Sequence, residues 1–268
     1  MIETIWTPAA DGVLSGARHD GERGDAIVFV HGVGSSAAIW DYQLHAFAKD
    51  YRCYAIELRG NGSAQHDPDP QRIDREGFVQ DVLAIAKTAQ LDRFHFVGCS
   101  LGGVVGFELW KRIPERLLSL TFVGSFAAYP NATSQVETIL AGATQAGSVA
   151  AFGRARVGKL LPSDASPVRH QETIDQMARK SLPSYIASTK ATWTGDYRDV
   201  LSTISVPTLV LCGELDLIAP LALSEEIAHA IPHAQLRVIP GAGHITNADQ
   251  PAAFNAALRE FLTTCSVH

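Results

Sequence analysis

The stretch GCSLGG, residues 98–103, decides the fold of this chain. Before it comes RFHFV, residues 93–97, a short run of aromatic and β-branched residues that is typical of a buried strand. After it, apolar residues recur at helical intervals until Pro114 ends the segment. The serine and two of the glycines therefore fill a G-x-S-x-G pattern at a strand-to-helix turn.

This position predicts that the turn is a nucleophile elbow, which holds the Oγ of Ser100 above the sheet at the start of the next helix. Gly98 and Gly102 favour that interpretation, because a strained turn brings neighbouring backbone too close for a Cβ. The alternative is a glycine-rich loop with a surface serine, and the pattern alone leaves it open. The strand before the pattern and the helix after it favour the elbow.

The rest of the chain alternates between apolar runs of strand length and segments with helical periodicity. A hairpin is expected around Asp11-Gly12, between residues 2–7 and 13–18. The further strands are expected in AIVFV (26–30), YRCYAIEL (51–58), LLSLTFVGS (117–125), VPTLVLCGELD (206–216) and AQLRVIPGAGH (234–244). The helices are expected near 37–49, 74–90, 221–231 and 251–264, and a polar loop over 59–70. Such alternation predicts an α/β fold with a mostly parallel, doubly wound sheet.

The alternation stops between residues 127 and 197. This part is helix-like and irregular, is interrupted by four prolines, and contains no strong strand signal. The simplest account is a helical cap, residues 127–197, inserted after the sixth strand. Residues 1–126 and 198–268 would then form the core domain.

Composition and charge limit the classes of partner. A net charge of −6 and the lack of a Lys/Arg cluster argue against binding to nucleic acid. No apolar run has the length of a membrane span, and the N-terminus does not resemble a signal peptide. Four separated cysteines without metal-ligand spacing fit a reducing compartment. We therefore expect a cytoplasmic protein without cofactor or metal, whose oligomeric state the sequence leaves open.

A serine nucleophile needs a base, and the base needs an orienting acid. Of ten histidines, His244 stands out because it lies in GAGH, directly after the last expected strand. Asp216 ends the preceding strand segment, and Glu214 is a weaker second candidate for the acid. The order Ser100, Asp216, His244 is the order that accompanies this elbow.

An oxyanion hole requires two aimed hydrogen-bond donors. The backbone N–H of Leu101, directly after the serine, is the first candidate. The second is the N–H of Val33 in HGVGSS (31–36), where glycines let the loop approach the site. We expect His31 to brace this loop by hydrogen bonds, and Cys99 to form part of the wall.

The segments HGVGSS, ELRGNG, GCSLGG, the Asp216 loop and GAGHITNADQP together resemble the α/β-hydrolase superfamily over nearly the whole chain. The closing segments are most similar to the 3-oxoadipate enol-lactonase-like group of small esterases and lactonases. The chain departs from the common pattern at Cys99, where histidine is frequent, and at Glu57, where aspartate is frequent. The resemblance implies a serine hydrolase of small carboxylic esters or lactones, with the cap covering the site.

Several cap and hinge residues are candidates for contact with the substrate. Four aromatic residues are candidates for an apolar acyl pocket, and packing between cap and core explains them equally well: Phe126, Tyr129, Phe152 and Trp193. Three basic residues are candidates to meet a substrate carboxylate, although a solvated helix face is more typical of such residues: Arg154, Arg156 and Lys159.

Two other functions remain open on the same scaffold. The same triad hydrolyses carbon–carbon bonds of ring-fission products, and a receptor on this scaffold binds a ligand without turnover. The loops near the triad offer few polar groups for a dienolate, which favours a small-molecule ester or lactone as substrate. Dehalogenase and epoxide hydrolase chemistry requires an aspartate at position 100, so we disfavour both.

Overall fold

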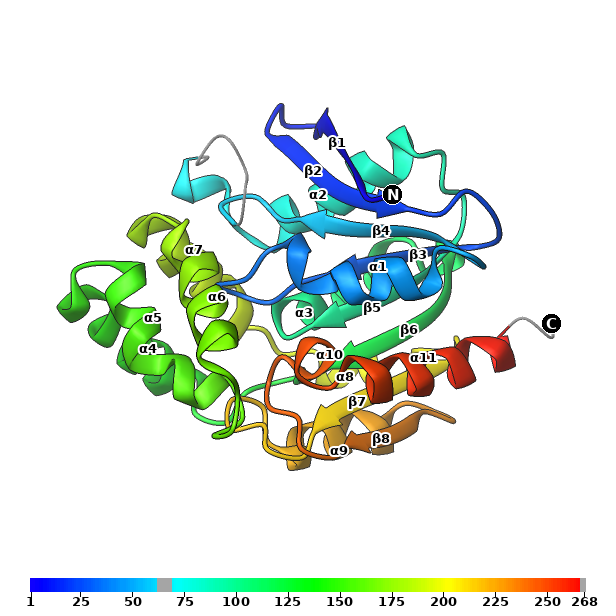
Figure 1. Cartoon of the computed structure of the whole chain (residues 1–268). Helices are drawn as coiled ribbons and strands as arrows, with labels where there is room; N and C mark the ends of the chain where they lie inside the picture. Colours follow the sequence, from blue (N-terminus) through cyan, green and yellow to red (C-terminus); the bar gives the residue numbers. More distant parts are fainter. Residues whose placement is uncertain (62–68, 266–268) are drawn as a thin grey trace.

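The computed structural model describes residues 1–61 and 69–265. Its strands form one eight-stranded sheet in the order β1-β2-β4-β3-β5-β6-β7-β8 (Figure 1). The strands are β1 Glu3–Pro8, β2 Leu14–Asp20, β3 Ala26–Val30, β4 Arg52–Glu57, β5 Phe94–Cys99, β6 Leu117–Val123, β7 Thr208–Gly213 and β8 Gln235–Ile239. Most of the loop expected over 59–70 lies outside the described residues.

The strand directions confirm a mostly parallel, doubly wound sheet. β1 and β2 form the hairpin expected around Asp11-Gly12, and β2 pairs antiparallel with β4. From β4 to β8 all neighbours are parallel. The chain moves outward from β3 to β4 and then crosses to β5 on the other side of β3. Ligands of open α/β sheets bind at such a switch point, beside the carboxyl ends of the strands.

Helices cover both faces of the sheet, because successive strand residues point to opposite sides. In β3, Ile27 and Phe29 pack toward α1 (Asp41–Phe47) and α11 (Pro251–Cys265). Val28 and Val30 pack on the other face, toward the second group of helices. This group comprises α2 Arg75–Thr88, α3 Leu101–Arg112, α8 Arg198–Leu201 and α9 Leu221–Ala230. The result is a three-layer α/β/α core (Figure 1).

Short 3-10 and α-helical turns complete the core. They are η1 Ala37–Trp40, η2 Pro70–Arg72, η3 Pro114–Arg116 and α10 Thr246–Asp249. The single helix expected near 37–49 is wrong in detail, since η1 is followed by α1, which ends at Phe47. Ala37, Ile39 and Trp40 of this 3-10 turn are buried in the apolar cluster that β3, α1 and α11 share.

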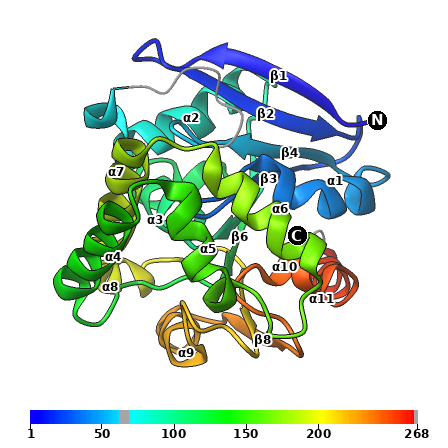
Figure 2. The same cartoon turned by 60° about the vertical axis from the view of Figure 1, so that its left-hand side comes forward.

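Four of the five helices between β6 and β7 lie beyond the carboxyl ends of the strands (Figures 1 and 2). They are α4 Ala132–Ala146, α5 Val149–Leu160, α6 Pro167–Ala178 and α7 Leu182–Trp193. Two prolines that suggested irregular structure, Pro167 and Pro183, instead stand in the first turns of α6 and α7. Proline is tolerated there, because the first N–H groups of a helix have no partner within the helix.

The structure therefore confirms the helical cap after the sixth strand. Ala128 and Asp196 form a β-bridge at its base, and Tyr197 N–H donates to the Ala127 carbonyl over 2.8 Å. The two chain segments that connect cap and core are thus joined to each other. The boundaries of 127 and 197 between two domains stay a prediction.

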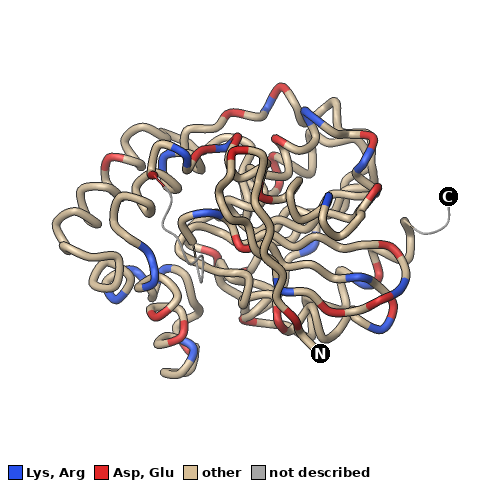
Figure 3. The backbone as a smooth tube through the Cα atoms, turned by 90° about the horizontal axis from the view of Figure 1, so that it is seen from above, with Lys and Arg blue, Asp and Glu red and all other residues tan. Residues whose placement is uncertain are grey.

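The described surface mixes charges of both signs. Figure 3 shows basic and acidic residues interspersed around the tube rather than gathered by sign on one side. In the ranges 1–61 and 69–265, no helix has both the length and the apolar character required to cross a bilayer.

Candidate active site

Ser100 occupies the turn between β5 and α3 with a strained backbone. Its φ of 54° and ψ of −110° place it where residues with a Cβ are rarely found. The turn is held on both sides: Ser100 N–H donates to the Val123 carbonyl over 2.9 Å, and the Ser100 carbonyl accepts from Gly103 N–H over 2.8 Å. Strain that is held in this way is typical of functional sites.

The glycines of the pattern have the predicted steric role. A Cβ on Gly98 would lie 2.3 Å from the carbonyl carbon and oxygen of Gly102. A Cβ on Gly102 would lie 2.3 Å from the carbonyl oxygen of Val30. Real contacts of this kind do not occur, so the approach of α3 to β5 and β3 depends on glycine at both positions.

His244 and Asp216 form a buried hydrogen-bonded pair. His244 Nδ1 lies 2.9 Å from Asp216 Oδ2, and their side chains are 7% and 0% exposed. The other oxygen, Oδ1, accepts from the backbone N–H of Ile218 (2.8 Å) and of Ala219 (2.9 Å). His244 N–H donates to the carbonyl of Leu160, at the end of cap helix α5, over 3.0 Å. Both the carboxylate and the imidazole are thereby fixed in orientation.

Gly124, directly after β6, connects this pair with the turn of Ser100. It has a φ of +49°, and a Cβ there would lie 2.9 Å from Asp216 Oδ2 and 3.2 Å from His244 Nδ1. Its neighbour Val123 accepts the hydrogen bond from Ser100 N–H. The structure thus places the three predicted residues after the carboxyl ends of strands β5, β7 and β8, with β6 between β5 and β7 in the sheet.

Neither Ser100 Oγ nor His244 Nε2 has a hydrogen-bond partner in the part of the chain that the structure describes. Catalytic hydrogen bonds without substrate are often long, and they shorten in the substrate complex. His244 Nδ1 faces Asp216, so Nε2 is the nitrogen left to accept a proton.

The predicted oxyanion-hole amides also lack partners. Neither Val33 N–H nor Leu101 N–H donates a hydrogen bond within residues 1–61 and 69–265, and Leu101 is the first residue of α3. The first N–H groups of a helix point outward and favour negative charge. A Cβ on Gly32 would lie 3.1 Å from Ser100 Cβ, so the loop that carries Val33 lies directly beside the serine.

His31 braces this loop, as expected. Its Nδ1 donates to the Gly32 carbonyl over 2.8 Å, and its Nε2 accepts from Leu58 N–H over 3.3 Å. The ring is fully buried. It therefore connects the loop after β3 with the loop after β4.

A small cavity of about 30 Å³ lies beside His244. Its walls come from the loop after β3, from η1, and from cap helices α5 and α6. The polar side chains in its wall are Ser35, Thr173, Gln176 and His244. The other lining residues are Gly32, Val33, Gly34, Ile39, Cys99, Leu160 and Ile245.

The four aromatic candidates belong to an apolar cluster between cap and core rather than to the wall of this cavity. The rings of Tyr129 and Trp193 lie 4.3 Å apart, and that of Phe126 lies 5.0 and 5.2 Å from them. Phe152 packs on Tyr185 at 5.7 Å. This arrangement accounts for their burial by packing, and a role in an acyl pocket stays a prediction.

Two of the three basic residues of α5 lie on a solvated face of the helix, the alternative to contact with a substrate carboxylate. Arg154 and Lys159 are exposed. The guanidinium of Arg156 lies 5.7 Å from the ring centre of Phe152, where a cation–π contact holds it.

Cys99 is a wall residue without thiolate character. It is buried, and burial raises the pKa of its thiol, to which the nearby carboxylates of Asp216 and Asp249 add. None of the four cysteines forms a disulfide, and Cys53 and Cys212 are buried in β4 and β7. Within the described ranges, no group of three or more His, Cys, Asp or Glu side chains is placed to hold a metal ion.

Glu214, the second candidate for the acid, is separated from His244. It is exposed, and its Oε2 accepts from Gly241 N–H over 2.9 Å. Asp216 is therefore the carboxylate that contacts the imidazole.

Asp249 is a site residue that sequence reasoning missed. Its Oδ2 accepts from Gly243 N–H over 3.0 Å, directly before His244, and its Oδ1 lies 3.7 Å from Nε of Arg169 in cap helix α6. Burial raises the pKa of its carboxyl group to about 6, although Arg169 and the Gly243 N–H oppose this. The sequence offers one indication that Asp249 belongs near the site, namely its position five residues after His244. Nothing in the sequence indicates the groups that it contacts.

We expect Asp249→Asn to stabilise the protein more at neutral than at acidic pH. An aspartate in the unfolded chain ionises near 3.8, and Asp249 in the folded chain near 6. The ionised carboxylate therefore lowers the free energy of unfolding above pH 6, and this loss disappears as the pH falls toward 3.8. The difference between these two pKa values corresponds to a loss of unfolding free energy of roughly 3 kcal/mol at neutral pH, at about 1.4 kcal/mol per pKa unit.

Urea unfolding at pH 7.5 and at pH 4 measures this effect. The stability of the variant relative to the wild type should decrease by an amount on the order of 3 kcal/mol between the two pH values. Asp164→Asn, at an exposed position, serves as control and should show no such change. A difference that is constant with pH would contradict the assignment.

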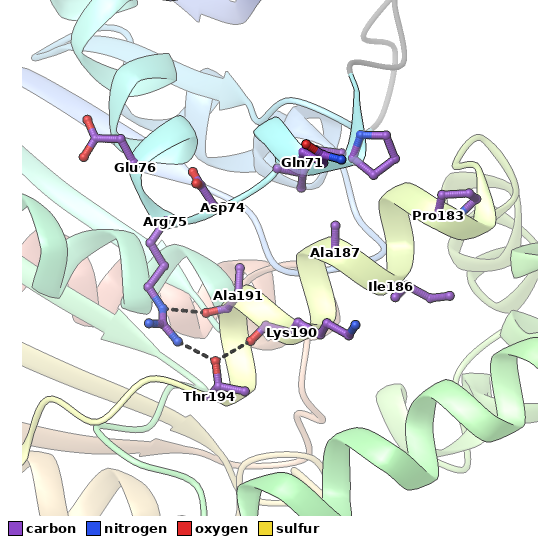
Figure 4. Close-up of a pocket in the computed structure, with 12 residues that line it drawn as sticks. Gln71, Asp74, Arg75, Glu76, Pro183, Ile186, Ala187, Lys190, Ala191 and Thr194 are labelled. Carbon is purple, nitrogen blue, oxygen red and sulfur yellow. Dashed lines mark hydrogen bonds between the residues drawn. The ribbon is translucent and has the colours of Figure 1, made fainter.

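A larger cavity of about 760 Å³ lies away from these residues, between the start of α2 and cap helix α7 (Figure 4). Along one edge, Arg75 Nε donates to the Ala191 carbonyl over 2.8 Å and Arg75 Nη2 to Thr194 Oγ1 over 2.7 Å. None of Ser100, Asp216 and His244 lines it. Arg75 here connects the cap to the core.

Comparison with known proteins agrees with this architecture. The family described as the alpha/beta hydrolase fold matches residues 25–251. The chain belongs to the α/β-hydrolase family.

Two relatives and one solved structure illustrate the range of this similarity. A Rhizobium rhizogenes protein that bears the name carbamate hydrolase RutD is 30% identical over 91% of this chain and 95% of its own. The 3-oxoadipate enol-lactonase 2 of Acinetobacter baylyi is 29% identical over 87% of this chain and 86% of its own. The crystal structure of the enol-lactonase from Burkholderia xenovorans LB400 superposes with a TM-score of 0.87 at 26% identity, covering 97% and 100% of the two chains.

Proposed function

We propose that this protein is a serine hydrolase of small carboxylic esters or lactones. The observation that carries the proposal is the buried His244–Asp216 pair at the same sheet edge as Ser100, whose backbone is held in a strained elbow. The relatives named as enol-lactonases support the same substrate class. No cofactor takes part in the proposed reaction.

In the first half-reaction, Ser100 Oγ attacks the carbonyl carbon while His244 Nε2 takes its proton. Asp216 holds Nδ1–H and stabilises the imidazolium that forms. The N–H groups of Val33 and Leu101 donate to the oxyanion of the tetrahedral intermediate. The carbon–oxygen bond to the leaving group then breaks, the leaving oxygen takes the proton from His244, and an acyl-enzyme on Ser100 remains.

In the second half-reaction, water attacks the acyl-enzyme and gives its proton to His244. The second tetrahedral intermediate uses the same two N–H donors, and Ser100 leaves with the proton from the imidazolium. For a lactone substrate, the leaving oxygen is part of the acyl chain itself, so this step releases a single product, the hydroxy acid.

Carbamate hydrolysis is a second candidate, because the cavity beside His244 is small and has a partly polar wall. A carbamoyl group has the shape of an acetyl group, and the same steps would transfer it to Ser100 and then to water. The relative that bears the name carbamate hydrolase supports this candidate.

A panel of substrates tests the proposal. The substrates are phenyl acetate, an enol-lactone, phenyl carbamate and a ring-fission dienone, all measured under the same conditions. We expect phenyl acetate or the enol-lactone to have a higher kcat/KM than the carbamate and the dienone. An activated phosphonate should label Ser100 stoichiometrically. A dienone preference of about a hundredfold, equivalent to about 2.7 kcal/mol, would overturn the ester–lactone reading. Labelling without turnover of any substrate would point to a receptor instead.

A further inference from the structure

Gln176, in cap helix α6, lies between two spaces. Its side chain lines the small cavity beside His244 and also a groove of about 360 Å³ between α6 and the η1–α1 segment of the core. It is half-buried. A substrate in the small cavity would therefore meet this side chain on the cap side.

The hydrogen bonds of Gln176 determine which of its atoms is available. Ser35 Oγ, in the loop that carries Val33, donates to Gln176 Oε1 over 3.1 Å. The amide nitrogen, Nε2, donates no hydrogen bond within the described ranges. The oxygen is thus directed to the oxyanion loop, and the NH₂ group remains as a donor.

The two polar side chains that line the cavity next to Gln176 are already used. Thr173 Oγ1 donates to the Arg169 carbonyl within α6, over 3.0 Å. The hydroxyl proton of Ser35 is given to Gln176. Gln176 Nε2 is therefore the donor among these three side chains that a substrate can engage.

The size of the cavity limits the group that would accept this hydrogen bond. A single water molecule needs roughly 10–15 Å³ of cavity volume, so the volume of about 30 Å³ admits a group of roughly two or three heavy atoms. An alkyl group there would remove water from Nε2 without replacing its hydrogen bond, which is costly. A hydroxyl group of the same size would accept a hydrogen bond from Nε2.

We propose that Gln176 selects short acyl groups that carry a hydrogen-bond acceptor, such as hydroxyacetyl, over alkyl acyl groups of equal size. It does so by a hydrogen bond from its Nε2 to the oxygen on the carbon next to the substrate carbonyl. This inference rests on the proposed function of Ser100, Asp216 and His244.

Phenyl glycolate and phenyl propionate form a suitable pair of probes, because their acyl groups differ by a hydroxyl in place of a methyl. The kcat/KM of each is divided by its rate with hydroxide to remove intrinsic reactivity. We expect the wild type to prefer the glycolate by about tenfold or more, and Gln176→Leu to lose this preference. Gln176→Met keeps the approximate length of the side chain and removes the donor, so it should lose the preference as well.

Gln171→Leu is the matched control, because Gln171 is exposed on the same helix and contacts Asp175. It should keep the wild-type ratio. A ratio that is equal in the wild type and both Gln176 variants, with hydrolysis intact, would overturn this inference alone. If the wild type hydrolysed neither ester, the proposed function and this inference would fall together.

Discussion

Replacing Ser100 with alanine should lower kcat/KM for phenyl acetate by about 10⁴-fold or more and leave substrate binding nearly intact. Alanine has the same Cβ and can occupy the same strained backbone, so the variant loses the Oγ and little else. Without Oγ no acyl-enzyme forms, and only the oxyanion hole and the positioning of substrate remain. Steady-state kinetics and the Kd of a slowly hydrolysed amide analogue separate the two effects.

Ser125→Ala is the control for this experiment. Ser125 is buried near the elbow, and its Oγ donates to the Val123 carbonyl over 3.1 Å. Its loss should change kcat/KM by less than about tenfold, because it removes one neutral hydrogen bond. If Ser100→Ala kept more than a few per cent of the wild-type activity, another residue would be the nucleophile.

The elbow was predictable because its determinants are local. The strand, the two glycines and the helix lie within about twenty consecutive residues. The steric need for Gly98 follows from the turn itself, because a Cβ at that position would meet Gly102, whereas Gly102 faces Val30 in β3. Local determinants also predict the hairpin around Asp11-Gly12, where a short turn fixes the pairing of two adjacent strands.

The contacts of the cap were not predictable from the sequence in this way. Ser35 and Gln176 are separated by 141 residues, and their hydrogen bond depends on how α6 is placed against the core. The periodicity of a helix shows which face is buried but not which loop it meets. Arg169 and Asp249 illustrate the same limit, since each alone resembles a surface charge.

The aromatic candidates show a different limit. An aromatic residue can pack between cap and core, or it can line an acyl pocket. The sequence pattern is the same in both cases, because both positions are apolar and buried. The cluster of Phe126, Tyr129 and Trp193 is closed by contacts among its own rings. Tyr129 also donates to the Ile218 carbonyl over 3.1 Å, in the loop that holds Asp216.

Asp216→Asn should lower kcat/KM by about 10⁴-fold, whereas Glu214→Gln should lower it by less than about threefold. In the wild type, Asp216 Oδ1 accepts from the N–H groups of Ile218 and Ala219, and Oδ2 faces His244 Nδ1. An asparagine would keep its single carbonyl oxygen on the two N–H donors. Its NH₂ group would then face Nδ1 and stabilise the tautomer that carries its proton on Nε2.

That tautomer cannot accept the proton of Ser100, and the charge that stabilises the imidazolium is lost as well. Glutamine at position 214 would still accept from Gly241 N–H at the exposed end of β7, so the site would be unchanged. Kinetics of both variants, with the midpoint of thermal unfolding to verify folding, distinguish the two carboxylates. Equal losses, or a larger loss at 214, would mean that His244 is oriented by a different group than the one it contacts here.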